Sequence, residues 1–90
     1  MSLWKEIEKI LQEMVEGQRK TLLNCGQRII PFLTTDDILQ PNDFAELENN
    51  PCFRYEEGIL AGILSVQIAL RAKQAEISES INGKIGNGYH

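Results

Sequence analysis

Residues 41–62, PNDFAELENNPCFRYEEGILAG, join two segments of different character and decide the fold. The first half is acidic and polar, and the second half runs into the apolar segment ILAGILSVQIAL, residues 59–70. Between them, Asn50 is a favoured helix N-cap, and Pro51 suits a first helical position because no backbone N–H is needed there. The stretch therefore predicts a connector that ends at residue 50 and a helix that begins at residue 51.

The second helix is indicated by apolar residues that recur at helical spacing. They are Phe53, Ile59 or Leu60, Ile63, Val66, Leu70, Ile77 and Ile81. Asn82 and Gly83 then form a typical helix C-cap, and further glycines follow. We predict a helix over 51–81 and a flexible C-terminal tail over 82–90.

The first helix follows from the same period. Apolar and neutral residues step by three or four at Trp4, Ile7, Leu11, Met14, Gln18, Leu22, Cys25, Ile29 and Phe32. Ser2 is a plausible N-cap, and Pro31 stops the helix because it lacks the N–H and restricts the residue before it. The chain is expected to be all-α, with long antiparallel helices at about 3–30 and 51–81 forming one hairpin domain over residues 1–81.

The connector, residues 31–50, carries local signals of its own. The sequence TTDD, residues 34–37, predicts a short turn at Asp36–Leu39. The sequence DFAE has the spacing of a capping box, with Asp43 as the cap and Glu46 three residues later, and predicts a short helix over 43–49. Large apolar residues among these signals indicate an ordered connector that packs on the helices.

Charge and composition limit the partners. The 90 residues carry a net charge of −4, which argues against nucleic acid because phosphate binding needs a basic patch. Residues 31–57 hold seven acids and one base, so this segment is the acidic part of the chain. The longest apolar run is too short for a membrane span, and the charged start MSLWKEIEKI is unlike a signal peptide. We expect a soluble, cytoplasmic protein that does not bind membranes.

Residues for catalysis are scarce. His90, the last residue, is the only histidine, and two separate cysteines make neither a disulfide framework nor a zinc site. The acids of the connector do not follow the spacing of a calcium-binding loop. We expect no enzyme, no catalytic residue, no cofactor and no metal.

The segment FRYEEG, residues 53–58, is a candidate recognition patch. Arg54 and Glu57 are neighbours on a helix, and Tyr55 is of a type enriched at interfaces. The candidate residues are Arg54, Tyr55, Glu56, Glu57, Asp43 and Glu46. The alternative is an ordinary helix start with a surface ion pair.

A stripe of small residues runs along the second helix. Gly58, Gly62, Ser65, Ala69 and Ala72 step by four and three and share one side of the helix. Glycine in a helix interior is costly, and close packing against another helix would offset that cost. In an antiparallel pair we predict that Gly26 faces Gly58 and that Gly17 faces Ser65. The small-residue stripe is our predicted close-packing interface.

The second helix is apolar on nearly every side, so one antiparallel partner does not cover it. Two copies that associate as a homodimer would cover it and give a four-helix bundle with an interface around residues 58–72. Alternatively, the connector folds back over the hairpin and the protein stays monomeric. We favour the homodimer, because two helices of this length expose more apolar surface than the connector covers.

The sequence therefore predicts a non-enzymatic helical protein–protein interaction module that self-associates, such as an adaptor, a small chaperone or an assembly subunit, with a protein partner. The alternative is a ligand-binding or sensor bundle. Its apolar pocket would lie between the helices, lined by Trp4, Met14, Phe53 and Leu60. A small enzyme is the third and weakest hypothesis.

Overall fold

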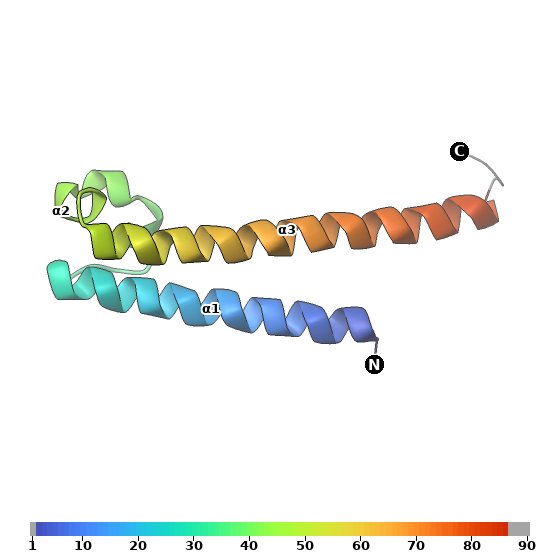
Figure 1. The fold of residues 1–90 in the computed structure, drawn as a ribbon, viewed down its shortest axis with the longest axis horizontal. Helices are drawn as coiled ribbons and strands as arrows, with labels where there is room; N and C mark the ends of the chain where they lie inside the picture. The colour runs from blue at the N-terminus through green and yellow to red at the C-terminus, as the bar shows by residue number, and fades with distance from the viewer. Residues whose placement is uncertain (1, 87–90) are drawn as a thin grey trace.

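The chain is a helical hairpin in the computed structural model, which describes residues 2–86 and the side chains of residues 2–81 (Figure 1). The elements are α1 (Leu3–Ile29), the 3₁₀ turns η1 (Asp37–Leu39) and η2 (Pro41–Asp43), the short helix α2 (Ala45–Glu48) and α3 (Pro51–Gly86). The two long helices lie side by side and antiparallel, and the short elements gather at one end. The predicted all-α hairpin with an ordered connector is confirmed.

Helix α1 begins and ends where the sequence predicts. The Ser2 hydroxyl accepts a hydrogen bond from the backbone N–H of Lys5 at 3.2 Å, which satisfies one of the free donors of the first turn. Ile29 is the last helical residue, and Ile30 is extended. The extended conformation is the one that a residue before proline prefers, so the end predicted at residue 30 is confirmed to within one position.

Helix α3 begins as predicted and ends later. The side-chain oxygen of Asn50 accepts from the N–H of Phe53 at 2.9 Å, and Pro51 is the first helical residue. The predicted end at residue 81 is wrong, because the helix continues to Gly86. A glycine inside a helix costs only about 1 kcal/mol, so Gly83 does not stop it. The rest of the predicted tail, 87–90, lies outside the described residues.

The connector contains both of its predicted short elements. The turn predicted at Asp36–Leu39 is confirmed as η1, and the N–H of Asp37 donates to the Thr34 hydroxyl at 3.3 Å. The short helix predicted over 43–49 is present as α2, but the capping box predicted for it is wrong. Asp43 ends η2, and Phe44 precedes α2 without a side-chain cap. Asp43 is the last residue of the turn that begins at Pro41, and α2 begins only at Ala45. Asp43 therefore does not occupy the N-cap position, which is the residue directly before a helix.

The core is concentrated at the closed end of the hairpin, where the connector meets both long helices. The most deeply buried side chains are Phe53, Leu22, Leu33, Leu47 and Val15. Gly26 makes this packing possible. A β-carbon at Gly26 would collide with the Leu33 side chain and lie 3.3 Å from Cε1 of Phe53. Connector and α3 therefore approach α1 closely at this point.

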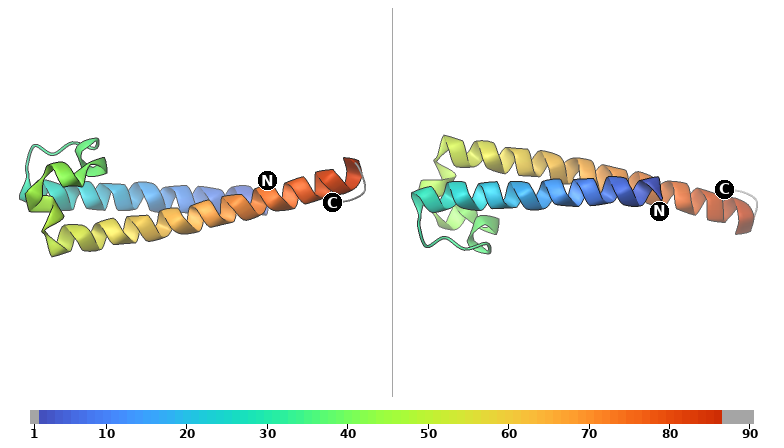
Figure 2. Two further views of the ribbon diagram at one scale, coloured as in Figure 1. Left: turned by 90° about the horizontal axis from the view of Figure 1, so that it is seen from above. Right: turned by 90° about the horizontal axis from the view of Figure 1, so that it is seen from below.

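The register of α1 against α3 differs from the prediction. Gln67 donates to Gln12 at 3.1 Å, and Arg71 lies 3.0 Å from Glu8 in an ion pair. The expected pairs Gly26–Gly58 and Gly17–Ser65 are wrong, because a β-carbon at Gly58 or at Gly17 would meet no heavy atom within 4 Å. With Glu8 beside Arg71, α3 extends past the start of α1, as Figure 2 shows.

Candidate functional site

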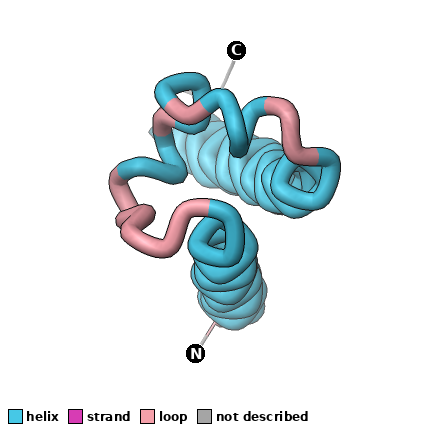
Figure 3. Tube along the Cα trace, turned by 90° about the vertical axis from the view of Figure 1, so that its left-hand side faces the viewer, coloured by secondary structure: helices cyan, strands magenta, loops and turns pink. Residues whose placement is uncertain are grey.

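The two sides of the hairpin differ, because the connector covers one of them. Figure 3 looks along the helix pair from its closed end and shows the connector on one side of it. Two polar contacts mark this connector side. The Gln27 amide donates to the carbonyl of Leu33 at 2.9 Å, and Nε of Arg54 donates to the carbonyl of Glu48 at 2.9 Å. The opposite side of the pair has no such cover.

Each long helix carries an apolar row on the uncovered side. Side chains turn by about 100° per residue around a helix. On α1, Ile10 and Met14 therefore lie on the other flank of the buried row from Gly26, which touches the connector. On α3, Val66 lies on the other flank of the buried row from Arg54. Because the helices are antiparallel, both rows point to the same side of the hairpin.

We call this surface the apolar side and define it by nine residues. They are Leu3, Ile7, Ile10 and Met14 of α1 with Ile59, Ile63, Val66, Leu70 and Ile77 of α3. Ile7, Ile59 and Ile63 are half-buried, and Ile63 packs against the core. The other six expose between 38% and 76% of their surface. The register that places Gln12 beside Gln67 also places Ile10 level with Leu70 and Met14 level with Val66.

Few charges interrupt the apolar side. The charged neighbours of its α3 row are Glu56 and Lys73, one at each end, and both have partners, while Glu6 and Glu13 lie along the outer edge of its α1 row. Oε1 of Glu56 accepts from Gln18 at 2.8 Å, and Lys73 pairs with Glu76 at 3.1 Å. The central part of the surface is a continuous apolar strip over two helices, which is a common mark of an interaction site.

The small-residue stripe lies elsewhere. Gly58, Gly62, Ser65, Ala69 and Ala72 are all exposed and point away from α1. Beyond the backbone of its own helix, a β-carbon at Gly58 or Gly62 would meet nothing within 4 Å. Within the hairpin the stripe therefore packs against no other element, and its role as an interface stays a prediction.

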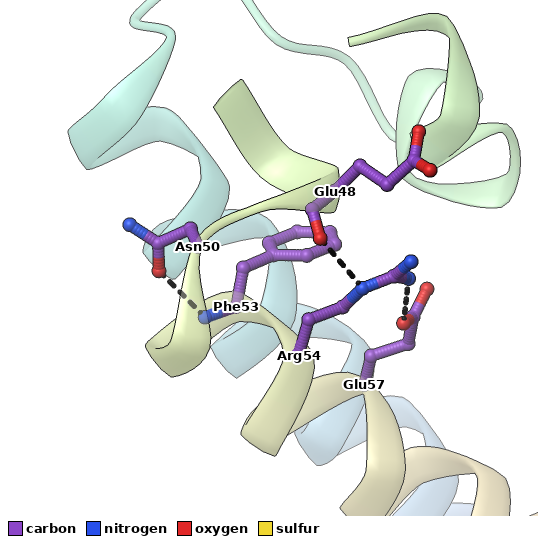
Figure 4. A network of polar contacts seen from close by, with 5 residues as sticks. All are labelled: Glu48, Asn50, Phe53, Arg54 and Glu57. Carbon is purple, nitrogen blue, oxygen red and sulfur yellow. Dashed lines mark hydrogen bonds and ion pairs between the residues drawn. The ribbon is translucent and has the colours of Figure 1, made fainter. Parts of the chain in front are cut away.

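The candidate recognition patch is divided by the fold, and Figure 4 shows two of its residues, Arg54 and Glu57, with their polar contacts. Nη1 of Arg54 lies 2.6 Å from the carboxylate of Glu57, while its Nε bonds to the Glu48 carbonyl, so Arg54 ties α3 to the connector. Glu56 turns toward α1 instead and binds Gln18. Tyr55 is exposed on the far side of α3, and Asp43 and Glu46 are exposed on the connector. Arg54 therefore has a structural role, whether or not a partner also binds there.

The residues expected to line an apolar pocket do not come together. Phe53 and Leu60 are buried near the closed end, Trp4 is half-buried near the open end, and Met14 is exposed on the apolar side. A shallow depression on the described surface is lined instead by Lys5, Glu8, Lys9, Gln12 and Arg71. All five of these side chains are polar or charged, although their aliphatic parts form most of the lining, and the depression is wide open to solvent, unlike the enclosed pockets that hold small ligands.

The described residues offer little chemistry of other kinds. Within 2–86 there is no cluster of three or more side chains of the types that bind metal. Both cysteines are free, with Cys25 buried and Cys52 exposed. Burial raises the pKa of the Cys25 thiol above its ordinary value, although the positive charge of Arg28 acts against this shift. A buried thiol of this kind is unreactive, so Cys25 serves as a small apolar core residue.

Comparison of the chain with protein-family models, curated proteins and solved structures finds no match. In the part of the chain that the structure describes, no helix combines the length and apolar character needed to cross a bilayer. Among the described features, the apolar side is thus the one that best suits a binding role. Its rows were visible in the sequence as residues 3, 7, 10 and 14 and residues 59, 63, 66, 70 and 77, each at steps that suit a helix.

Proposed function

We propose that the protein is a non-enzymatic helical protein–protein interaction module that self-associates, as an adaptor, a small chaperone or an assembly subunit does. The apolar side is the observation that supports this proposal. It combines rows from both long helices and contains six of the exposed large apolar side chains. Burying such side chains is the main favourable term in protein association.

The solvent-exposed surface area of the hairpin also supports self-association. The chain exposes 6549 Å². A compact monomer of 10.2 kDa would expose only about 5,300 Å², so the hairpin exposes roughly 1,200 Å² more. In a standard specific interface each partner buries about 800 Å². The excess reflects the elongated shape of the whole chain and is of the same order as one side of such an interface, and a homodimer of two hairpins would be a four-helix bundle.

The charge of the chain supports a protein partner rather than nucleic acid or a membrane surface. A net charge of −4 repels phosphate groups, and the acidic residues concentrate in 31–57. The non-enzymatic part of the proposal rests on the sequence, where the sole histidine is the last residue. Two free cysteines suit a reducing compartment, and we place the protein in the cytoplasm.

Light scattering after gel filtration, over a range of protein concentrations, tests the proposal. We expect a species of twice 10.2 kDa that dissociates only on strong dilution. Circular dichroism at the same concentrations checks that the chain remains helical. A well-folded species of 10.2 kDa at every concentration would contradict self-association.

A further inference from the structure

We infer that a second copy of this chain covers the apolar side. The two hairpins pack with their apolar sides together. Their long helices run in opposite directions, so the two connectors lie at opposite ends of the dimer. This inference rests on the proposed function and adds the surface and the orientation. It also replaces the small-residue stripe as the expected interface.

The choice of surface follows from what each side of α3 presents. The apolar side is continuous with the core, because Ile63 packs both against the buried cluster and beside the exposed rows. A second hairpin there buries side chains from α1 and α3 together. The small-residue stripe, by contrast, is made of glycine, serine and alanine on α3 alone, and it has less apolar surface to bury.

A second copy fits the apolar side because the surface matches itself. In a two-fold dimer each copy presents the same patch, so the patch must carry no charge that would meet its own equivalent. Along its centre, the strip from Ile59 to Leu70 and from Ile7 to Met14 meets this condition. Glu56 and Lys73 stand at the ends of its α3 row, and Glu6 and Glu13 lie along the outer edge of its α1 row. A second copy also supplies an apolar strip of the same length.

The orientation follows from the charges at the two ends of the hairpin. At the closed end, residues 16–57 carry eight acids and four bases, and seven of these acids lie in residues 31–57. Near the open end, four bases stand with four acids: Lys5, Lys9, Arg71 and Lys73 with Glu6, Glu8, Glu76 and Glu79. The connectors lie on the outer sides of either dimer, but a parallel dimer places both net-negative closed ends at the same end of the bundle, where their like charges repel each other most. An antiparallel dimer places each connector near a neutral end and avoids this repulsion.

The first part of the test identifies the surface with a matched pair of variants. Val66 and Ile68 are both β-branched, both exposed and both on α3, but Val66 lies on the apolar side and Ile68 on the connector-side flank. We expect Val66→Lys to raise the dimer dissociation constant by about 100-fold, because a two-fold interface carries the change twice. Ile68→Lys and Gly62→Leu should leave it nearly unchanged. The assignment of the surface fails if Ile68→Lys or Gly62→Leu dissociates the dimer while Val66→Lys does not.

The second part measures the orientation with the natural Cys52. Cys52 is exposed at the closed end, and Cys25 is buried, so a spin label attaches to Cys52 in the unmodified chain. The α3 row has its centre near residue 68, which lies 16 residues from Cys52. In the antiparallel dimer the two labels are therefore about 48 Å apart along the axis, whereas in a parallel dimer they are roughly 25 Å apart or closer. The variant Cys52→Ser is the control for labelling at Cys25.

The outcomes separate the two proposals. Dimers with a long distance between labels support the orientation, and dimers with a short distance overturn it while self-association stands. A monomer in light scattering overturns self-association itself, and with it this inference.

Discussion

The side-chain amide of Gln67 donates to the side-chain oxygen of Gln12 at 3.1 Å and joins the two long helices across 55 residues of sequence. Among the side chains that the structure describes, Gln67 is the one polar side chain that is buried. No described buried side-chain nitrogen or oxygen lacks a hydrogen-bond partner. A polar pair inside an apolar helix interface favours one register, because any other register leaves the buried amide unpaired.

Substitution of Gln67 tests how much the pair stabilises the fold. Gln67→Leu keeps the volume and removes the polar group, and half-buried Gln12 can then turn to water. We expect the free energy of unfolding to change by about 1 kcal/mol or less in either direction. Gln67→Ala also leaves a cavity and should cost about 1–3 kcal/mol. Urea denaturation measures both values, and equal losses for the two variants would show that the hydrogen bond, rather than the packing, is what stabilises the hairpin.

The packing around Gly26 predicts a clear difference between two glycines. Gly26→Ala places a methyl group against Leu33 and Phe53, and we expect it to lower the free energy of unfolding by about 1–2 kcal/mol despite the better helix propensity of alanine. Gly62→Ala is the matched control, because it meets nothing within 4 Å. It should raise stability by up to about 1 kcal/mol. If Gly62→Ala also destabilises the protein, another chain packs at Gly62.

The N-cap of α3 predicts a second matched pair. Asn50→Ala removes the acceptor for the N–H of Phe53 and should cost about 1 kcal/mol. The neighbouring Asn49 is exposed, and none of the side-chain hydrogen bonds found in the described region involves it, so Asn49→Ala should change stability by less than about 0.5 kcal/mol. Thermal and urea denaturation of the three proteins give the comparison. Similar losses for both variants would place the effect in the connector as a whole rather than in the cap.

The two cysteines should differ in reactivity. In the native protein a thiol reagent such as Ellman's should modify exposed Cys52 quickly and buried Cys25 only on unfolding. Burial raises the pKa of Cys25 above its ordinary value of 9.0, so the protonated thiol is favoured in the folded state. Its contribution to stability is complete below that ordinary value and is lost as the pH rises through the folded pKa. Fast modification of both thiols at neutral pH would contradict this burial.

The helices were predictable because their signals are local. The apolar period, Ser2, Pro31, Asn50 and Pro51 act within one or two turns, and the structure has the boundaries that they indicate. Asp43 shows where local signals fail. This residue fits both a capping box and a 3₁₀ turn that begins at Pro41, and the structure has the turn. The end of α3 was missed because glycine weakens a helix without ending it.

The register and the candidate surface were not predictable in the same way. Small residues at helical spacing suit close packing and exposure equally well, so the sequence alone did not decide where Gly58 and Gly62 point. The direction in which these glycines point depends on which flank of α3 meets α1. The burial of Phe53, Leu60 and Gln67 shows that their flank meets it. The apolar side also depends on the connector, which covers one flank of the pair and leaves Val66 and Met14 uncovered. Both properties belong to the tertiary arrangement.

The concentration of the core at the closed end makes stability uneven along the hairpin. Three packed elements hold the backbone near Leu22 and Phe53, so we expect amide protons there to exchange with solvent only when the whole molecule opens. Toward the open end α3 runs past α1, and its amides exchange through local fraying. We therefore expect opening to proceed from the open end toward the connector. Half-buried Trp4, close to the start of α1, is a natural fluorescent probe of its first step.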